Sequence, residues 1–141
     1  MVIAASLLLS AAGLFADGAD RDKIIGFWQS QGGGDTRASW ILQSKGDVLH
    51  ITRVENDRKL ADFECNTVGR ECKVKEADKP MKVSIWFNGP KLVIMETRGN
   101  DVLKRRFHAT DDGKEIEMET IPIVPQGKPE VVRLQRAPAS N

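Results

Sequence analysis

The sequence has few of the side chains that most often bind metal ions or carry out catalysis. It contains two cysteines and two histidines in 141 residues, and their wide spacing does not suit a zinc site. An excess of either charge is also missing, since 21 Lys and Arg balance 20 Asp and Glu to a net charge of +1. Nucleic-acid binding needs a basic surface, so we expect no nucleic-acid partner. Neither histidine can be placed with a nucleophile and an orienting group, and we expect no enzymatic activity, metal or cofactor.

Amphipathic helices are missing as well. After Asp22, no segment carries apolar residues at helical spacing over a useful length. Instead, short segments rich in β-branched residues alternate with turn formers, which predicts strands. The expected strands are 26–31, 38–44, 47–54, 60–65, 72–75, 81–88, 91–98, 101–109, 114–121 and 130–136. Such strands predict one all-β domain, a lipocalin-like antiparallel up-and-down β-barrel of about 8–10 strands, with a sandwich as the alternative.

The one long apolar stretch lies at the N-terminus, where no charged residue occurs from Val2 to Ala16. A run of about 15 residues is short for a membrane span, which needs about 20, but it suits the hydrophobic region of a secretory signal. We therefore predict a signal peptide at 1–19, a barrel domain at 20–141, and no membrane span in the mature protein. The predicted location is secreted or periplasmic. The alternative is a buried N-terminal helix of the fold.

Cys65 and Cys72 are the two cysteines, and they flank a short segment with the turn formers Asn66 and Gly69. This pattern predicts a tight hairpin with a sulfur atom at each end. In an oxidising compartment we expect the two to form a disulfide, which contributes about 2.5 kcal/mol by loop-entropy arithmetic. A redox-active pair and two free thiols are the alternatives, although the spacing differs from the C-x-x-C redox motif.

Three turn signals, at 88–89, 99–100 and 112–113, predict which residues share a face. The first turn pairs Ile85 with Leu92. Because side chains alternate along a strand, all three hairpins place the same set of apolar residues on one inner face. This predicted inner face consists of Val83, Ile85, Phe87, Leu92, Ile94, Leu103, Phe107, Ile116 and Met118.

Two charged residues, Glu96 and Arg105, also fall on this inner face, on adjacent strands and diagonal to each other. A charge in an apolar interior is costly unless it is paired and hydrogen-bonded. One interpretation is a structural ion pair. The other is a polar anchor in a ligand cavity, where Arg105 binds a carboxylate if Glu96 does not already satisfy it.

The start of the first strand, Gly26-Phe27-Trp28, resembles the G-x-W motif of the lipocalins and the wider calycin group. Those proteins are antiparallel barrels that mostly bind small apolar ligands, with an arginine of the last strand packed over the tryptophan. The resemblance implies a structural role for Trp28, on which Arg133 or Arg136 would stack. It also implies a small exported barrel of the kind common in bacterial secretomes.

Two functions follow from these observations. The first is an exported barrel that binds a small apolar or amphipathic ligand on the inner face, together with Glu96 and Arg105. The second is a structural or interaction module with a filled core and no ligand, whose protein partner the sequence does not identify. Interior volume distinguishes the two, since ligand pockets occupy about 300–1,000 Å³ and large apolar side chains can also pack solidly.

Overall fold

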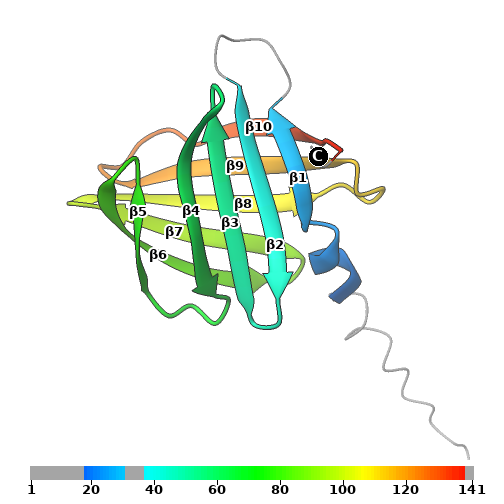
Figure 1. Ribbon diagram of the computed structural model, residues 1–141, viewed down its shortest axis with the longest axis horizontal. Helices are drawn as coiled ribbons and strands as arrows, with labels where there is room; N and C mark the ends of the chain where they lie inside the picture. Colours follow the sequence, from blue (N-terminus) through cyan, green and yellow to red (C-terminus); the bar gives the residue numbers. More distant parts are fainter. Residues whose placement is uncertain (1–17, 31–36, 139–141) are drawn as a thin grey trace, which may run out of the picture.

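The computed structural model describes residues 18–30 and 37–138, which form a nearly closed antiparallel β-barrel (Figure 1). The strands are β1 (Gly26–Ser30), β2 (Ala38–Lys45), β3 (Val48–Glu55), β4 (Arg58–Asn66), β5 (Cys72–Glu76), β6 (Lys79–Asn88), β7 (Lys91–Arg98), β8 (Asp101–Ala109), β9 (Glu115–Val124) and β10 (Glu130–Arg136). Their order across the sheet is β4-β3-β2-β1-β10-β9-β8-β7-β6-β5. The predicted all-β, up-and-down barrel is confirmed, with a strand at each expected place.

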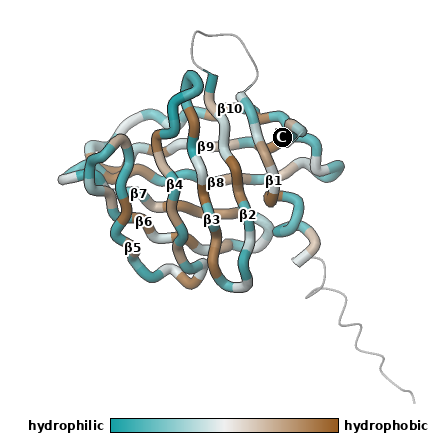
Figure 2. The backbone as a smooth tube through the Cα atoms, in the orientation of Figure 1, coloured by the Kyte–Doolittle hydropathy of each residue, from teal (hydrophilic) through white to brown (hydrophobic). Residues whose placement is uncertain are grey.

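Alternation of side-chain polarity explains why these segments form a barrel. In β6, Met81 and Val83 are buried, whereas Lys82 between them is exposed. Leu49 and Ile51 are the buried residues of β3. Successive side chains of a strand point to opposite faces, so the apolar set comes together inside the barrel. Figure 2 shows hydrophobic and hydrophilic positions alternating along the strands.

The predicted registers hold for two of the three hairpins. Ile94 pairs with Arg105 across the 99–100 turn, and Phe107 pairs with Met118 across the loop that follows β8. The register expected at 88–89 is wrong by two residues, because the turn consists of Gly89 and Pro90 and Phe87 pairs with Leu92. Gly89 has a φ of +59°, which suits the first central position of a type II′ turn. A shift of two residues leaves every side chain on its predicted face.

The hairpin expected between the two cysteines is absent, since β4 and β5 are the two edges of the sheet rather than paired neighbours. The connecting loop bonds to β6 instead: the Gly69 N–H donates to the Ile85 carbonyl at 2.9 Å, and Val68 bridges to Trp86. The loop therefore crosses the line where the barrel closes. We call this line between β4 and β5 the seam.

The seam is held at both of its ends. At one end Cys65 and Cys72 form the predicted disulfide, with their Cα atoms 6.0 Å apart. At the other end the Ala77 N–H donates to the Leu60 carbonyl at 2.8 Å. A covalent bond and a hydrogen bond thus replace part of the ladder that would otherwise join the two edge strands.

Replacing both cysteines by alanine is expected to lower the free energy of unfolding by about 2.5 kcal/mol, because the unfolded chain regains the entropy of the open loop. Urea denaturation of the variant, and of the wild type with and without dithiothreitol, measures this loss. The reduced wild type and the double variant should agree. A loss near zero would show that the disulfide does not constrain the unfolded chain.

The N-terminal segment closes one end of the barrel. Residues 18–22 form a short helix, and Ile24 just after it is completely buried. The Ile24 carbonyl accepts a hydrogen bond of 2.7 Å from Trp28 Nε1. Arg21 lies over the Phe87 ring, 4.9 Å from its centroid, and donates to the Gly89 carbonyl. We call this the closed end and the opposite one the open end.

Arg136 completes the closed end. Its guanidinium lies 4.3 Å from the centroid of the Trp28 ring, so the stacking implied by the lipocalin resemblance is present. The same group donates to the carbonyls of Gly113 at 2.9 Å, Ile25 at 2.9 Å and Lys23 at 2.7 Å. One arginine of the last strand therefore ties together the N-terminal segment and the loop after β8.

Arg136 rather than Arg133 stacks on Trp28, because the two side chains lie on opposite faces of β10. Arg133 points outward, where it pairs with Glu115 at 3.5 Å and Glu117 at 3.2 Å. Arg136 points to the barrel end, over Gly26, where an added Cβ atom would overlap its Nη1 atom. The glycine of the G-x-W motif thus makes room for the arginine that covers the tryptophan.

Replacing Arg136 by lysine is expected to lower the free energy of unfolding by about 1–3 kcal/mol, because an ammonium cannot hold three divergent carbonyls and stack on a ring. The matched control is Arg133→Lys on the same strand, which should cost less than about 0.5 kcal/mol as an exposed ion pair. Thermal denaturation of both variants checks this. Equal losses would contradict the structural role of Arg136.

The predicted signal peptide lies outside the described residues, apart from Gly18 and Ala19 in the short helix. The boundary between signal and domain therefore stays a prediction. In the described part of the chain, no helix is both long enough and apolar enough to cross a membrane.

Candidate functional site

The residues of the predicted inner face do come together inside the barrel. Most are at least nine-tenths buried: Val83, Ile85, Leu92, Ile94, Phe107, Ile116 and Met118, as well as the charged Glu96 and Arg105. Phe87 and Leu103 are half-buried. Phe87 packs at the closed end beside Arg21. Whether any of them contacts a ligand stays a prediction.

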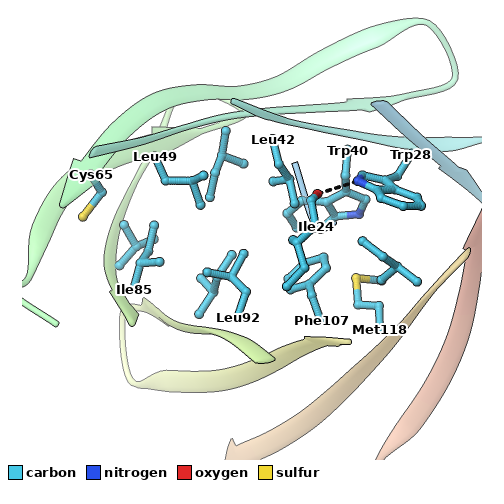
Figure 3. Packing of buried hydrophobic residues seen from close by; sticks show 14 of the residues in the cluster. Ile24, Trp28, Trp40, Leu42, Leu49, Cys65, Ile85, Leu92, Phe107 and Met118 are labelled. Carbon is cyan, nitrogen blue, oxygen red and sulfur yellow. Dashed lines mark hydrogen bonds between the residues drawn. The ribbon is translucent and has the colours of Figure 1, made fainter. Parts of the chain in front are cut away.

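The opposite wall was not identified from the sequence. Trp28, Trp40, Leu42, Leu49 and Ile51 come from the first three strands, and each is at most 2% exposed. In Figure 3 these strands contribute side chains that face Ile85, Leu92, Phe107 and Met118 from across the barrel. Trp40 meets Phe107 edge to face, with ring centroids 5.2 Å apart. The alternation of buried and exposed residues in β2 and β3 was a signal for these positions, but no turn dipeptide fixed their face.

Glu96 and Arg105 form an ion pair inside the barrel. Arg105 Nε donates to Glu96 Oε1 at 3.1 Å, and the two side chains are 8% and 3% exposed. Arg105 Nη1 also donates to the Thr120 hydroxyl at 3.1 Å. This geometry supports the interpretation of a structural ion pair, because Arg105 already has a carboxylate partner in its own chain.

This ion pair continues into a larger network toward the open end. Arg98 Nη2 donates to Glu96 Oε2 at 3.1 Å and to the two oxygens of Glu76 at 2.8 and 2.9 Å. Arg53 then donates to Glu76 at 3.2 Å and to Glu55 at 3.4 Å. We call the set Arg53, Glu55, Glu76, Glu96, Arg98 and Arg105 the mouth network. It joins β3, β5, β7 and β8 across the seam.

The mouth network shifts the pKa values of several members. Burial alone would raise the pKa of Glu76, but the Arg98 hydrogen bond and the charges of Arg53 and Arg98 outweigh it and lower that pKa. Burial would likewise lower the pKa of Arg98, yet its contacts with Glu76 and Glu96 raise it. For Arg105, burial prevails over the attraction of Glu96, and its pKa is lowered.

Glu76 is expected to make protein stability depend on pH. Its pKa in the folded state lies below the ordinary 4.5, so its contribution is present above about pH 4.5 and is lost as the pH falls through the lower folded value. We expect Glu76→Gln to destabilise the protein by about 1.5–3 kcal/mol at neutral pH and by less in acid. Urea denaturation of both proteins across this range measures the difference.

The control for this prediction is Glu119→Gln. Glu119 pairs with Arg106 at 3.4 Å on the outer face, and both side chains are more than one-third exposed. Such an exposed pair contributes little to stability, so this variant should have nearly the same free energy of unfolding as the wild type at each pH. A Glu76→Gln difference that stayed constant with pH would contradict the predicted linkage.

Trp40 marks the boundary between the apolar core and the mouth network. The guanidinium carbons of Arg53 and Arg105 lie 4.9 and 5.3 Å from the centroid of its ring. Within the described residues, Arg53 Nε is the one buried side-chain nitrogen or oxygen that has no hydrogen-bond partner. A buried donor without an acceptor is unfavourable, so an acceptor oxygen that reached this N–H would be stabilised there.

Several inward-facing apolar side chains, on the two strands of the seam and near the open end, keep accessible surface. Phe63, Val74 and Leu103 are half-buried, and Val132, opposite Met118, is 38% exposed. The open half of the interior thus combines accessible apolar walls with a few placed charges, which is typical of sites for small molecules.

Two hollows in the described surface have mainly other linings, although Val74 and Met81 line the first of them. One of about 430 Å³ lies between β5, β6 and the turn after β7, and one of about 670 Å³ lies beside the loop after β8 and the end of β10. Neither is lined by a residue of the predicted inner face. Across residues 18–30 and 37–138, no group of three or more His, Cys, Asp or Glu side chains is arranged to hold a metal ion.

Comparison with known proteins gives matches in structure. No protein-family model matches the chain, and no curated protein matches its sequence significantly. Fatty-acid-binding protein 1 of Echinococcus granulosus has a TM-score of 0.69, with 83% of this chain and 99% of that protein covered at 9% identity. A Schistosoma mansoni fatty-acid-binding protein, solved with arachidonic acid, has a TM-score of 0.66 at 11% identity, with 84% and 99% covered.

A third match is secretory abundant heat soluble protein 4 of Ramazzottius varieornatus, with a TM-score of 0.68 at 13% identity and coverage of 81% and 94%. This chain has a calycin-like fold. The lipocalin resemblance of the G-x-W segment therefore holds at the level of the fold.

Proposed function

We propose that this chain binds a small apolar or amphipathic molecule inside its barrel, as a carrier or receptor rather than an enzyme. The observation behind the proposal is the open half of the interior, where accessible apolar side chains share the inner surface of the barrel with the mouth network. The printed descriptions of two structural matches, both fatty-acid-binding proteins, support the same class of ligand. The predicted inner face would form the floor and walls of the site.

We further propose that the protein acts outside the cytoplasm, in a secreted or periplasmic location. The disulfide between Cys65 and Cys72 supports this, since disulfides persist mainly in oxidising compartments. The apolar run from Val2 to Ala16 supports export as well. Fractionation of cells that express the full chain, with N-terminal sequencing of the mature product, tests both the location and the cleavage site.

Binding is tested with Nile red, an uncharged dye whose emission shifts to the blue in apolar surroundings. We expect saturable binding with one dye per protein. Val132→Trp should fill the open half of the interior and weaken binding by about tenfold or more. The matched control is Val131→Trp, because Val131 is the next residue and points to the outer face. Equal binding by both variants would place the dye on the surface and contradict the proposal.

A second function, a module with a filled core and no ligand, is favoured by the packing itself. The buried apolar cluster includes residues from Ile24 at the closed end to Met81 of β6. If Nile red does not bind, and mass spectrometry of the purified protein finds no co-purifying apolar molecule, this second function is the correct one.

A further inference from the structure

We propose that the barrel interior accepts uncharged amphipathic molecules and discriminates against carboxylates, because Glu76 and Glu96 already occupy the arginines of the mouth network. This inference rests on the proposed function and defines the chemical class of its ligand. It concerns the polar end of the molecule, which would lie against the mouth network while the apolar part contacts the accessible inner walls.

The charges of the mouth network are balanced. Three guanidinium groups alternate with three carboxylates, and five ion pairs of 2.8–3.4 Å join them: Glu55 with Arg53, Arg53 with Glu76, Glu76 with Arg98, Arg98 with Glu96, and Glu96 with Arg105. No guanidinium in this network is without a carboxylate partner. The network therefore lacks the excess positive charge that a carboxylate needs in order to leave water.

A ligand carboxylate would also meet like charges. To reach Arg53 or Arg98 it would have to approach Glu76, whose side chain is 17% exposed and contacts both arginines. To reach Arg105 it would have to approach Glu96, which is 3% exposed. Like charges in a partly buried site disfavour each other's ionised forms. Entry of a carboxylate would thus require one glutamate to leave or to take up a proton.

An uncharged polar group avoids both penalties, the loss of hydration of a charge and the repulsion by Glu76 and Glu96. Arg53 Nε is buried and lacks a partner among the described residues, so a hydroxyl, ester or ketone oxygen that reached it would accept its hydrogen bond. Its guanidinium lies over Trp40 at 4.9 Å, at the boundary where an apolar tail would end. One free donor and no net charge together suit an alcohol or ester better than an acid.

The test compares dodecan-1-ol with dodecanoate as competitors of bound Nile red, at about pH 8, where a carboxylic acid is ionised. For the wild type we expect the alcohol to bind about tenfold more tightly than the acid, or better. In Glu76→Gln the network gains a positive charge, so dodecanoate should bind about tenfold more tightly than to the wild type while the alcohol changes less than about threefold.

Two further variants make the result independent of one substitution. Glu55→Gln removes a carboxylate from Arg53 at the more exposed end of the network and should change the preference in the same direction. Glu119→Gln, on the outer face, makes the same chemical change without touching the network and should leave both affinities unaltered. Circular dichroism confirms that each variant is folded before it is titrated.

The outcomes separate the two proposals. Tighter binding of dodecanoate than of dodecan-1-ol to the wild type would overturn the inference and leave the proposed function intact. A preference for the alcohol that neither Glu76→Gln nor Glu55→Gln reduces would also overturn it, since charge would not be the cause. If Nile red and both competitors fail to bind, the proposed function is wrong and the inference falls with it.

Discussion

Replacing Glu96 by leucine is expected to lower the free energy of unfolding by about 3–5 kcal/mol, since removal of one partner of a buried ion pair leaves the other charge uncompensated. Glu96 is 3% exposed and holds both Arg105 and Arg98. The variant would leave the Arg105 guanidinium, 8% exposed, with the Thr120 hydroxyl as its remaining partner. Urea denaturation at neutral pH measures the loss.

The double variant Glu96→Leu, Arg105→Leu provides the control. An apolar pair of similar volume often replaces a buried ion pair at little cost, so the double variant should be more stable than Glu96→Leu alone. A double-variant loss equal to the sum of the two single losses would contradict a coupled pair. Arg105→Leu alone also bears on function: if Arg105 served mainly as an anchor for a ligand carboxylate, this change would abolish dodecanoate binding with little change in melting temperature.

Replacing Trp28 by alanine is the second change with a large expected effect, a loss of about 3–5 kcal/mol. The Trp28 side chain is completely buried, its indole N–H is bonded to the Ile24 carbonyl, and Arg136 covers its ring. The substitution would leave a cavity at the closed end and remove the surface on which the N-terminal segment packs. Thermal and urea denaturation should both report the loss.

Trp86→Ala is the matched control, because Trp86 points to the outer face of β6 and is half-buried. Its loss should be near the average for a point substitution, about 1 kcal/mol. Similar losses for the two tryptophans would mean that the closed end does not depend on the G-x-W motif.

The strands and the inner face of β6–β9 could be predicted because they depend on local signals. Gly99 and Gly113 have positive φ values, and the dipeptides around them mark the turns that set two hairpin registers. The turn at Gly89 was misplaced, because Asn-Gly and Gly-Pro overlap there and both suit a primed turn. The faces remained correct, since the side-chain period of a strand is two.

The rest of the mouth network could not be predicted for a different reason. Glu96, Arg98 and Arg105 lie on the two strands of one hairpin, β7 and β8, whereas Arg53 and Glu55 come from β3 and Glu76 from β5. The contact of Arg53 with Glu76 exists because the sheet curls until its edges meet, and no turn signal reports that closure. The alternation that buries Leu49 and Ile51 does point Arg53 inward. However, only closure of the barrel determines which strand supplies its partner.

The seam has a consequence for self-association. β4 and β5 are the edge strands of the sheet, and a free edge offers unpaired backbone groups on which a strand of another molecule can add. The Cys65–Cys72 disulfide and the Ala77–Leu60 hydrogen bond turn these two edges toward each other. We therefore expect the disulfide to protect the protein against edge-to-edge polymerisation, and we expect the reduced protein to aggregate at lower concentrations than the oxidised one.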